Sequence, residues 1–145
     1  MKKMLVFVFS LLPPLLPLFF PSGSVDAQIA KEKPLMTKVL PDISGEEGLI
    51  ETVVLSPGEV VPAHRHNADV FAYVLEGSIV TQLEGHKSQT VHTGEAFYES
   101  PGDVHIASRN ASATQPARLL VFFVKKIGAP TTVALRTRTL PAKAP

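Results

Sequence analysis

The chain has 145 residues, a formal net charge of +1 and no cysteine. Its charges are scattered without runs, so nothing indicates a nucleic-acid partner or an anionic surface, and a disulfide-supported fold is excluded. The expected partner is a small molecule or another protein, and a homodimer of this chain is left open.

Residues 1–27 have the organisation of a secretory signal peptide. Two lysines precede an apolar run over residues 5–20, and Val25-Asp26-Ala27 suits a signal peptidase, so we expect cleavage after Ala27. A membrane anchor is the competing interpretation, but three prolines interrupt the run, which is shorter than the roughly 20 apolar residues that span a bilayer. We therefore expect an exported protein, periplasmic or secreted, with no stable membrane anchor after cleavage.

The remaining chain predicts one domain with two flanking segments. Removing residues 1–27 from 145 leaves 118 residues, enough to enclose one core but not two. Prolines and a glycine make residues 28–47 an irregular or edge-pairing arm, and residues 48–127 form the expected barrel. Residues 128–145 are either a loose tail or carry one edge strand near residues 132–135.

From Gly48 onward, short β-branched and aromatic runs alternate with turn residues, as expected of strands. Residues 70–75 are apolar at both odd and even positions, which predicts a strand that is covered on both faces. Other strands are expected at residues 49–55, 60–61, 78–83, 90–93, 96–98, 104–107 and 118–124. No segment after residue 27 sustains a helical period, so the pattern predicts an all-β sandwich or closed barrel.

Three of the five histidines are candidate metal ligands. His64 and His66 are two residues apart, so in an extended strand both imidazoles lie on one face and can hold one ion. His105 follows a Pro-Gly turn and is the expected third ligand, because imidazole nitrogen suits borderline divalent metals. His86, at a hairpin tip, and His92, beside a turn, are expected to be ordinary surface or hydrogen-bonded residues.

The residues around these histidines resemble the two signature motifs of the cupin superfamily. The matching residues are Gly58, Pro62-Ala63-His64-Arg65-His66, Tyr73-Val74-Leu75-Glu76-Gly77, Gly94, Pro101, Gly102, His105 and Asn110. The resemblance covers residues 48–124 and implies a small single-domain cupin of type 2, loosely quercetin-dioxygenase-like, with one double-stranded β-helix (jelly-roll) barrel. It also implies a divalent metal ion between the histidines, with Fe or Mn favoured and Zn, Ni or Cu as alternatives.

The chain departs from the family pattern at the fourth ligand. Cupins typically carry a glutamate four residues after the second histidine, and Val70 occupies that position here. Asp69 is adjacent, but a shift of one residue turns a strand side chain to the opposite face unless this segment is still loop. Asp69 is therefore a candidate ligand whose alternative role is that of a solvated turn residue.

The second motif carries one additional residue. Six residues rather than five separate Gly94 from Pro101, an insertion that a bulge would accommodate by changing the direction of nearby side chains. The candidate inward polar or catalytic groups are Glu99, Tyr98 and Gln82. Hydrogen bonding or surface exposure is the alternative for each of them.

The resemblance allows two functions, since one fold hosts many activities. The first is a metalloenzyme of dioxygenase-like type, with isomerase chemistry also open, that acts on a chelating oxygenated substrate. The second is a non-catalytic module that captures a small ligand or a metal, which the missing glutamate at position 70 favours. A polar group such as Glu99 facing the metal would separate them, because proton transfer needs a group within hydrogen-bond reach.

Two further features have alternative interpretations. Phe71, Tyr73, Phe97 and Phe122 are candidate pocket walls, with plain core packing expected for at least half of them.

Asn110-Ala111-Ser112 is a glycosylation acceptor in a eukaryotic secretory host, or else Asn110 fixes a turn through its amide.

Overall fold

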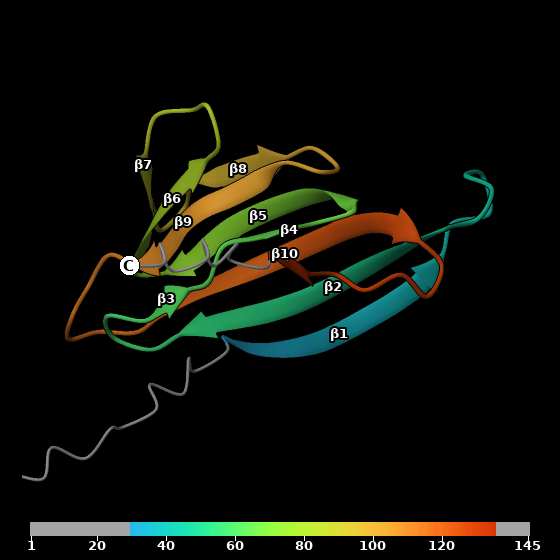
Figure 1. Cartoon of the computed structure of the whole chain (residues 1–145). Coiled ribbons are helices and arrows are strands. Elements are labelled where there is room, and N and C mark those ends of the chain that lie inside the picture. The colour runs from blue at the N-terminus through green and yellow to red at the C-terminus, as the bar shows by residue number, and fades with distance from the viewer. Residues whose placement is uncertain (1–29, 136–145) are drawn as a thin grey trace, which may run out of the picture.

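The computed structural model describes residues 30–135, and these residues form two antiparallel sheets without any helix (Figure 1). The first sheet contains, in spatial order, β1 (Lys31–Val39), β2 (Glu46–Leu55), β10 (Ala117–Lys126), β5 (Ala68–Glu76) and β8 (Ala96–Glu99). The second contains β11 (Val133–Ala134), β4 (His64–Arg65), β9 (Val104–Asn110), β6 (Ser78–Leu83) and β7 (Gln89–His92), with β3 (Val60–Val61) beside β9. The all-β jelly-roll prediction is confirmed.

The two sheets enclose one apolar interior because their strands alternate between buried and exposed residues. In β10 every second residue is buried: Ala117, Leu119, Val121 and Phe123. Burial of side chains as large as the last three contributes roughly 1.5–3 kcal/mol each relative to leaving them in water. This periodicity of two fixes which residues of each strand face the interior.

Strand β5 corrects the prediction that residues 70–75 are covered on both faces. Val70, Ala72 and Val74 are buried, whereas Phe71 and Tyr73 are 50% and 44% exposed. The ring of Phe71 lies near two other rings of the same outer face, those of Tyr98 and Phe122. Aromatic contacts on an outer face therefore produce the same sequence signal as double burial.

The segments flanking the expected barrel also contribute strands. Strand β1, within the expected arm, pairs along β2 as the edge of the first sheet, and β2 begins at Glu46, two residues before the expected boundary. Strand β11 pairs with β4 at the edge of the second sheet, so residues 133–134 take the edge-strand alternative.

Residues 1–27 lie outside the described residues, as do residues 136–145. Within residues 30–135 there is no helix of the length and apolar character needed to cross a bilayer.

Gly77 makes the turn that carries the chain from β5 in the first sheet to β6 in the second. Its φ is +75°, a left-handed conformation that glycine adopts without steric cost. A Cβ atom at this position would lie 2.8 Å from the carbonyl oxygen of Pro116, so any other residue would also force the backbone to shift. The glycine thus allows this turn to lie close to the backbone at the start of β10.

Asn110 ends β9 and is buried, with 2% of its surface exposed. Its amide nitrogen donates to the carbonyl oxygens of Leu55, Ser56 and Gln115, and its amide oxygen accepts from the backbone N–H of Ser112. The folded protein therefore does not present this amide as a glycosylation acceptor, and the turn-fixing interpretation describes the residue.

Candidate metal centre

Short strands bring three histidines together inside the barrel. His64 lies in β4 and pairs directly with His105 in β9, and their rings stack with centroids 4.8 Å apart. His66 follows β4, and its backbone carbonyl accepts a hydrogen bond from the N–H of Gly102, in the turn before β9. All three histidines are buried, and one nitrogen from each lies within 4.8 Å of the others. The structure thus brings the three candidate ligands to one point.

Each histidine has its Nδ1 atom engaged by an oxygen. The Nδ1 atoms of His64 and His66 lie 2.7 Å and 2.6 Å from the backbone carbonyls of Pro62 and Thr131. A carbonyl only accepts, so each Nδ1 carries the proton and each Nε2 keeps a free lone pair. The His105 Nδ1 atom lies 3.3 Å from the hydroxyl of Thr81, which is compatible with the same tautomer. This arrangement orients the Nε2 lone pairs for metal binding.

Burial also keeps the first ligand in its neutral form. Desolvation lowers the pKa of His64 below its usual value, and the neighbouring His105 and His66 act in the same direction. The hydrogen bond to Pro62 and the charge of Glu99 oppose this shift without reversing it. His64 is therefore neutral at neutral pH, the state in which an imidazole binds a metal.

Glu99, at the end of β8, supplies a carboxylate beside the three rings. Its Oε2 atom lies 2.7 Å from Nε2 of His105 and 3.6 Å from Nε2 of His66. Despite the short distance, neither Glu99 Oε2 nor His105 Nε2 makes a hydrogen bond with any described residue, although both atoms are fully buried. Two ligand atoms at right angles around an ion at ~2.1 Å are ~3 Å apart, so these distances fit a shared divalent ion.

Glu99 lies beside Val70, the position at which cupins typically carry a glutamate. In the antiparallel pairing of β5 with β8, Glu99 lies directly opposite Val70. Directly opposed residues project their side chains to the same face of a sheet. Both residues line the interior cavity, so the carboxylate comes from the neighbouring strand. The pairing from residue 96 to residue 99 shows no register shift, so no bulge within β8 is needed to direct Glu99 inward.

The other candidate polar groups do not reach this site. Tyr98 is 48% exposed, and its hydroxyl donates to Asp69 on the outer side of the sheet. Asp69 is therefore directed away from the histidines, as expected for a one-residue shift along a strand. Gln82 donates to the backbone carbonyl of His86 in its own hairpin. The structure thus places Tyr98, Asp69 and Gln82 outside the group of histidines and off the cavity lining.

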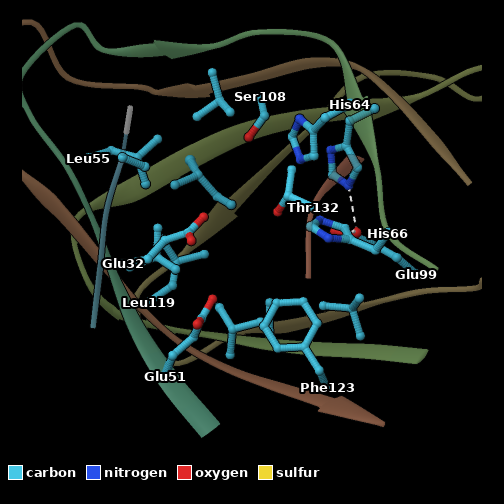
Figure 2. Close-up of a pocket in the computed structure, with 18 of the residues that line it drawn as sticks. Glu32, Glu51, Leu55, His64, His66, Glu99, Ser108, Leu119, Phe123 and Thr132 are labelled. Carbon is cyan, nitrogen blue, oxygen red and sulfur yellow. Dashed lines mark ion pairs between the residues drawn. The ribbon is translucent and has the colours of Figure 1, made fainter. Parts of the chain in front are cut away.

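A cavity of about 370 Å³ adjoins the histidines and Glu99 (Figure 2). Most of its wall is apolar and includes Leu55, Val70, Phe97, Leu119 and Phe123. Its size is that of a site for a small molecule. Three imidazoles and the carboxylate of Glu99 thus lie beside a mostly apolar cavity. A site of this kind can bind and orient a ligand.

Of the four aromatic residues that were candidate pocket walls, the structure places only Phe97 on the cavity. Phe71, Tyr73 and Phe122 are absent from its lining and belong to the outer face of the first sheet. Phe123, which the sequence analysis did not single out, lines the cavity and packs against His66 with ring centroids 5.5 Å apart. The sequence signal that could have separated these residues is the strict alternation of β10, which puts Phe122 and Phe123 on opposite faces.

Two histidines lie outside the centre, as expected. His86 is exposed, with Nδ1 near the backbone carbonyl of Glu84, and His92 is exposed, with Nδ1 2.8 Å from the hydroxyl of Ser78. Neither residue lines the cavity.

Solved structures of known proteins share the fold described above. A DMSP lyase from Ruegeria pomeroyi is 21% identical, with a TM-score of 0.61 over 77% of this chain and 54% of that one. A Thermus thermophilus protein is 28% identical, with a TM-score of 0.53 over 67% of this chain and 84% of that one. An oxalate oxidase solved in complex with glycolate is 25% identical, with a TM-score of 0.51 over 60% of this chain and 45% of that one.

This chain thus spans about half the length of the lyase and less than half of the oxidase. No curated protein sequence matches it. The family model described as a cupin domain matches residues 51–123, which include His64, His66, Glu99 and His105. The match covers half of the chain, and the chain belongs to the cupin family.

Proposed function

We propose that this protein is an exported, metal-dependent cupin enzyme with dioxygenase-like chemistry, acting on a small oxygenated molecule that chelates the ion. The observation that carries the proposal is the buried carboxylate of Glu99, which faces the three histidines. A carboxylate in this position supplies the acidic group that Val70 does not, and the missing glutamate was the feature that favoured a non-catalytic module.

In this proposal His64, His66, His105 and Glu99 hold a divalent metal ion. Three neutral imidazoles with one carboxylate favour Fe or Mn, since carboxylate oxygen suits the harder ions of the series. The ion, when bound, supplies Lewis-acid polarisation and a template for the substrate. The protein orients the rings through their Nδ1 hydrogen bonds, and the apolar cavity wall excludes water from the ligand.

The nature of the substrate is proposed from the cavity and from one similar structure. A cavity of about 370 Å³ fits a small molecule. The oxalate oxidase noted above was solved with glycolate, a small hydroxy acid whose two oxygen-bearing groups can chelate a metal. By analogy, we propose that adjacent oxygen atoms of the substrate bind at the histidine end of the cavity.

The proposal is tested by metal analysis followed by an oxygen-uptake screen. Protein recovered from the export compartment should contain about one Fe or Mn per chain and should begin at Gln28. With phenolic and diketone substrates, we expect oxygen uptake that His105→Ala abolishes and His92→Ala retains. Bound metal and bound ligand without oxygen uptake would instead favour the non-catalytic module.

A further inference from the structure

The cavity has a second polar end, formed by two glutamates. Glu51 in β2 and Glu32 in β1 both line the cavity, and Figure 2 shows them away from His64 and His66. Glu32 pairs opposite Val53, two residues from Glu51, so the two carboxylates are diagonal neighbours on one face of the sheet. The metal centre and the glutamate pair therefore bound the same apolar space at different places.

Glu51 is buried but has no partner of its own. Only 3% of its surface is exposed, and no hydrogen bond joins its carboxylate to another described residue. The nearby Lys125 is bonded to Glu47 and to the carbonyl of Ala129. Burial, with a smaller contribution from the charge of Glu32, raises the pKa of Glu51 to about 7, although the charge of Lys125 partly opposes these effects. A buried carboxylate in this state is expected to have a ligand, a functional role or both.

The charge of the lining indicates what kind of ligand this is. No lysine or arginine among the described residues lines the cavity, and the nearby Lys125 is already paired with Glu47, so the lining itself offers the two glutamates no counter-charge. A cation placed between them would offset both the cost of desolvating Glu51 and the repulsion from Glu32. A neutral hydroxyl would satisfy a hydrogen bond but would leave the repulsion in place.

We propose that the cavity binds a small amphipathic zwitterion, with a chelating carboxylate at the metal centre, an aliphatic middle, and an ammonium-type cation at Glu51 and Glu32. The inference rests on the proposed function, because it places the carboxylate on the ion held by the histidines. The apolar residues of the cavity wall, Leu55 and Leu119 among them, accept the aliphatic middle. Selectivity then arises from simultaneous occupation of both polar ends.

The test uses Mn(II)-loaded protein and two matched ligand series in calorimetric titrations. One series is the ω-aminoalkanoates of four to eight carbons, and the other is the unsubstituted alkanoates of the same lengths. We expect the amino compounds to bind about tenfold more tightly at one preferred length, since charge complementarity inside a cavity requires the right reach. Glu51→Gln should remove that preference and leave the binding of the unsubstituted alkanoate in place.

Two further variants separate this inference from its alternatives. Glu32→Gln, on an exposed edge strand, should reduce the preference about threefold, and it tests the inference even if Glu51→Gln folds poorly. Glu84→Gln removes the same charge from an exposed hairpin and should change nothing. Metal-loaded protein that binds both series equally, or prefers amines regardless of length, overturns the inference alone. Failure to take up metal overturns the proposed function together with it.

Discussion

Asn110 and Glu99 are buried to nearly the same degree, with 2% and 4% of their surfaces exposed, but their surroundings differ. Every polar atom of the Asn110 side chain is hydrogen-bonded to the backbone around it. Glu99 and His105 instead retain buried atoms that no described residue satisfies. Burial is thus common to Asn110 and to Glu99, and the unsatisfied bonding capacity of the Glu99 side chain is what separates the two residues.

The largest test of this contrast is removal of a histidine. His64→Ala, His66→Ala and His105→Ala should each lower metal affinity by roughly a hundredfold or more, because two imidazoles hold a divalent ion weakly against water. Metal content measured after dialysis checks this result. His86→Ala and His92→Ala are the matched controls and should retain the metal, since neither residue lines the cavity. Full metal content in His64→Ala would contradict the proposed centre.

Metal should also raise the unfolding temperature of the wild type, because an ion that binds only the folded state stabilises it by mass action. The three alanine variants should lose this increase and should differ less from the wild type after chelation. An equal metal-induced increase in all variants would locate the ion elsewhere.

The second test moves the carboxylate between strands. Glu99→Val should lower metal affinity by roughly tenfold to a hundredfold. Loss of a group that only hydrogen-bonds to a metal ligand already has an effect of this size. Since residues 70 and 99 are directly opposed and both line the cavity, Val70→Glu combined with Glu99→Val should recover part of that affinity. Titration with Mn(II) measures both changes. A double variant no better than Glu99→Val would mean that position 70 does not project its carboxylate to the ion.

These contrasts explain which parts of the molecule the sequence predicts. The strand positions follow from alternation and turn residues, and the meeting of the three histidines follows from their spacing and the cupin motifs. The role of Glu99 is ambiguous because Phe97 and Tyr98 are adjacent and so point to opposite faces of the strand. The local sequence therefore does not show which face is buried. Its direction is set by pairing with Val70, a contact between residues far apart in the chain.

The glutamate pair shows the same limit more strongly. Glu51 lies within a run of β-branched and apolar residues and Glu32 within a charged one, and no local motif connects them. Only the pairing of β1 with β2 brings the two carboxylates to one face. The sequence predicts that residues 28–47 form an arm, but it does not predict that Glu32 of this arm lines the cavity.

The third test is made at the structural turn. Asn110→Ala should lower the free energy of unfolding by roughly 2 kcal/mol, because three buried or partly buried carbonyls lose a donor. Metal affinity measured below the unfolding transition should stay within about twofold of the wild type, since Asn110 contributes nothing to the centre. A large loss of affinity in the folded variant would show that the turn and the centre are coupled. Equilibrium urea denaturation of metal-free protein measures the stability change.

The smallest expected effect belongs to the unpartnered carboxylate of Glu51. Its pKa is raised to about 7 in the folded protein against an ordinary value of 4.5, so the folded state holds this proton more tightly than the unfolded state. The contribution of Glu51 to stability should therefore fall as pH rises from about 4.5 to 7 and should then level off. Glu51→Gln should be more stable than the wild type by about 1 kcal/mol at pH 7.5, a value discounted from the full pKa shift for solvent screening.

The comparison needs metal-free protein, because protons and the metal ion would otherwise compete for the histidine nitrogens and make the stability depend on pH in a second way. Urea denaturation in a chelator at pH 4.5 and pH 7.5 should give nearly equal stabilities at the lower pH and a gain for Glu51→Gln at the higher pH. Glu84→Gln, with an exposed carboxylate, should follow the wild type at both values. Parallel pH profiles for the wild type and Glu51→Gln would mean that Glu51 is as well solvated as Glu84. The acidic end of the cavity would then lack the uncompensated charge that a cationic ligand requires.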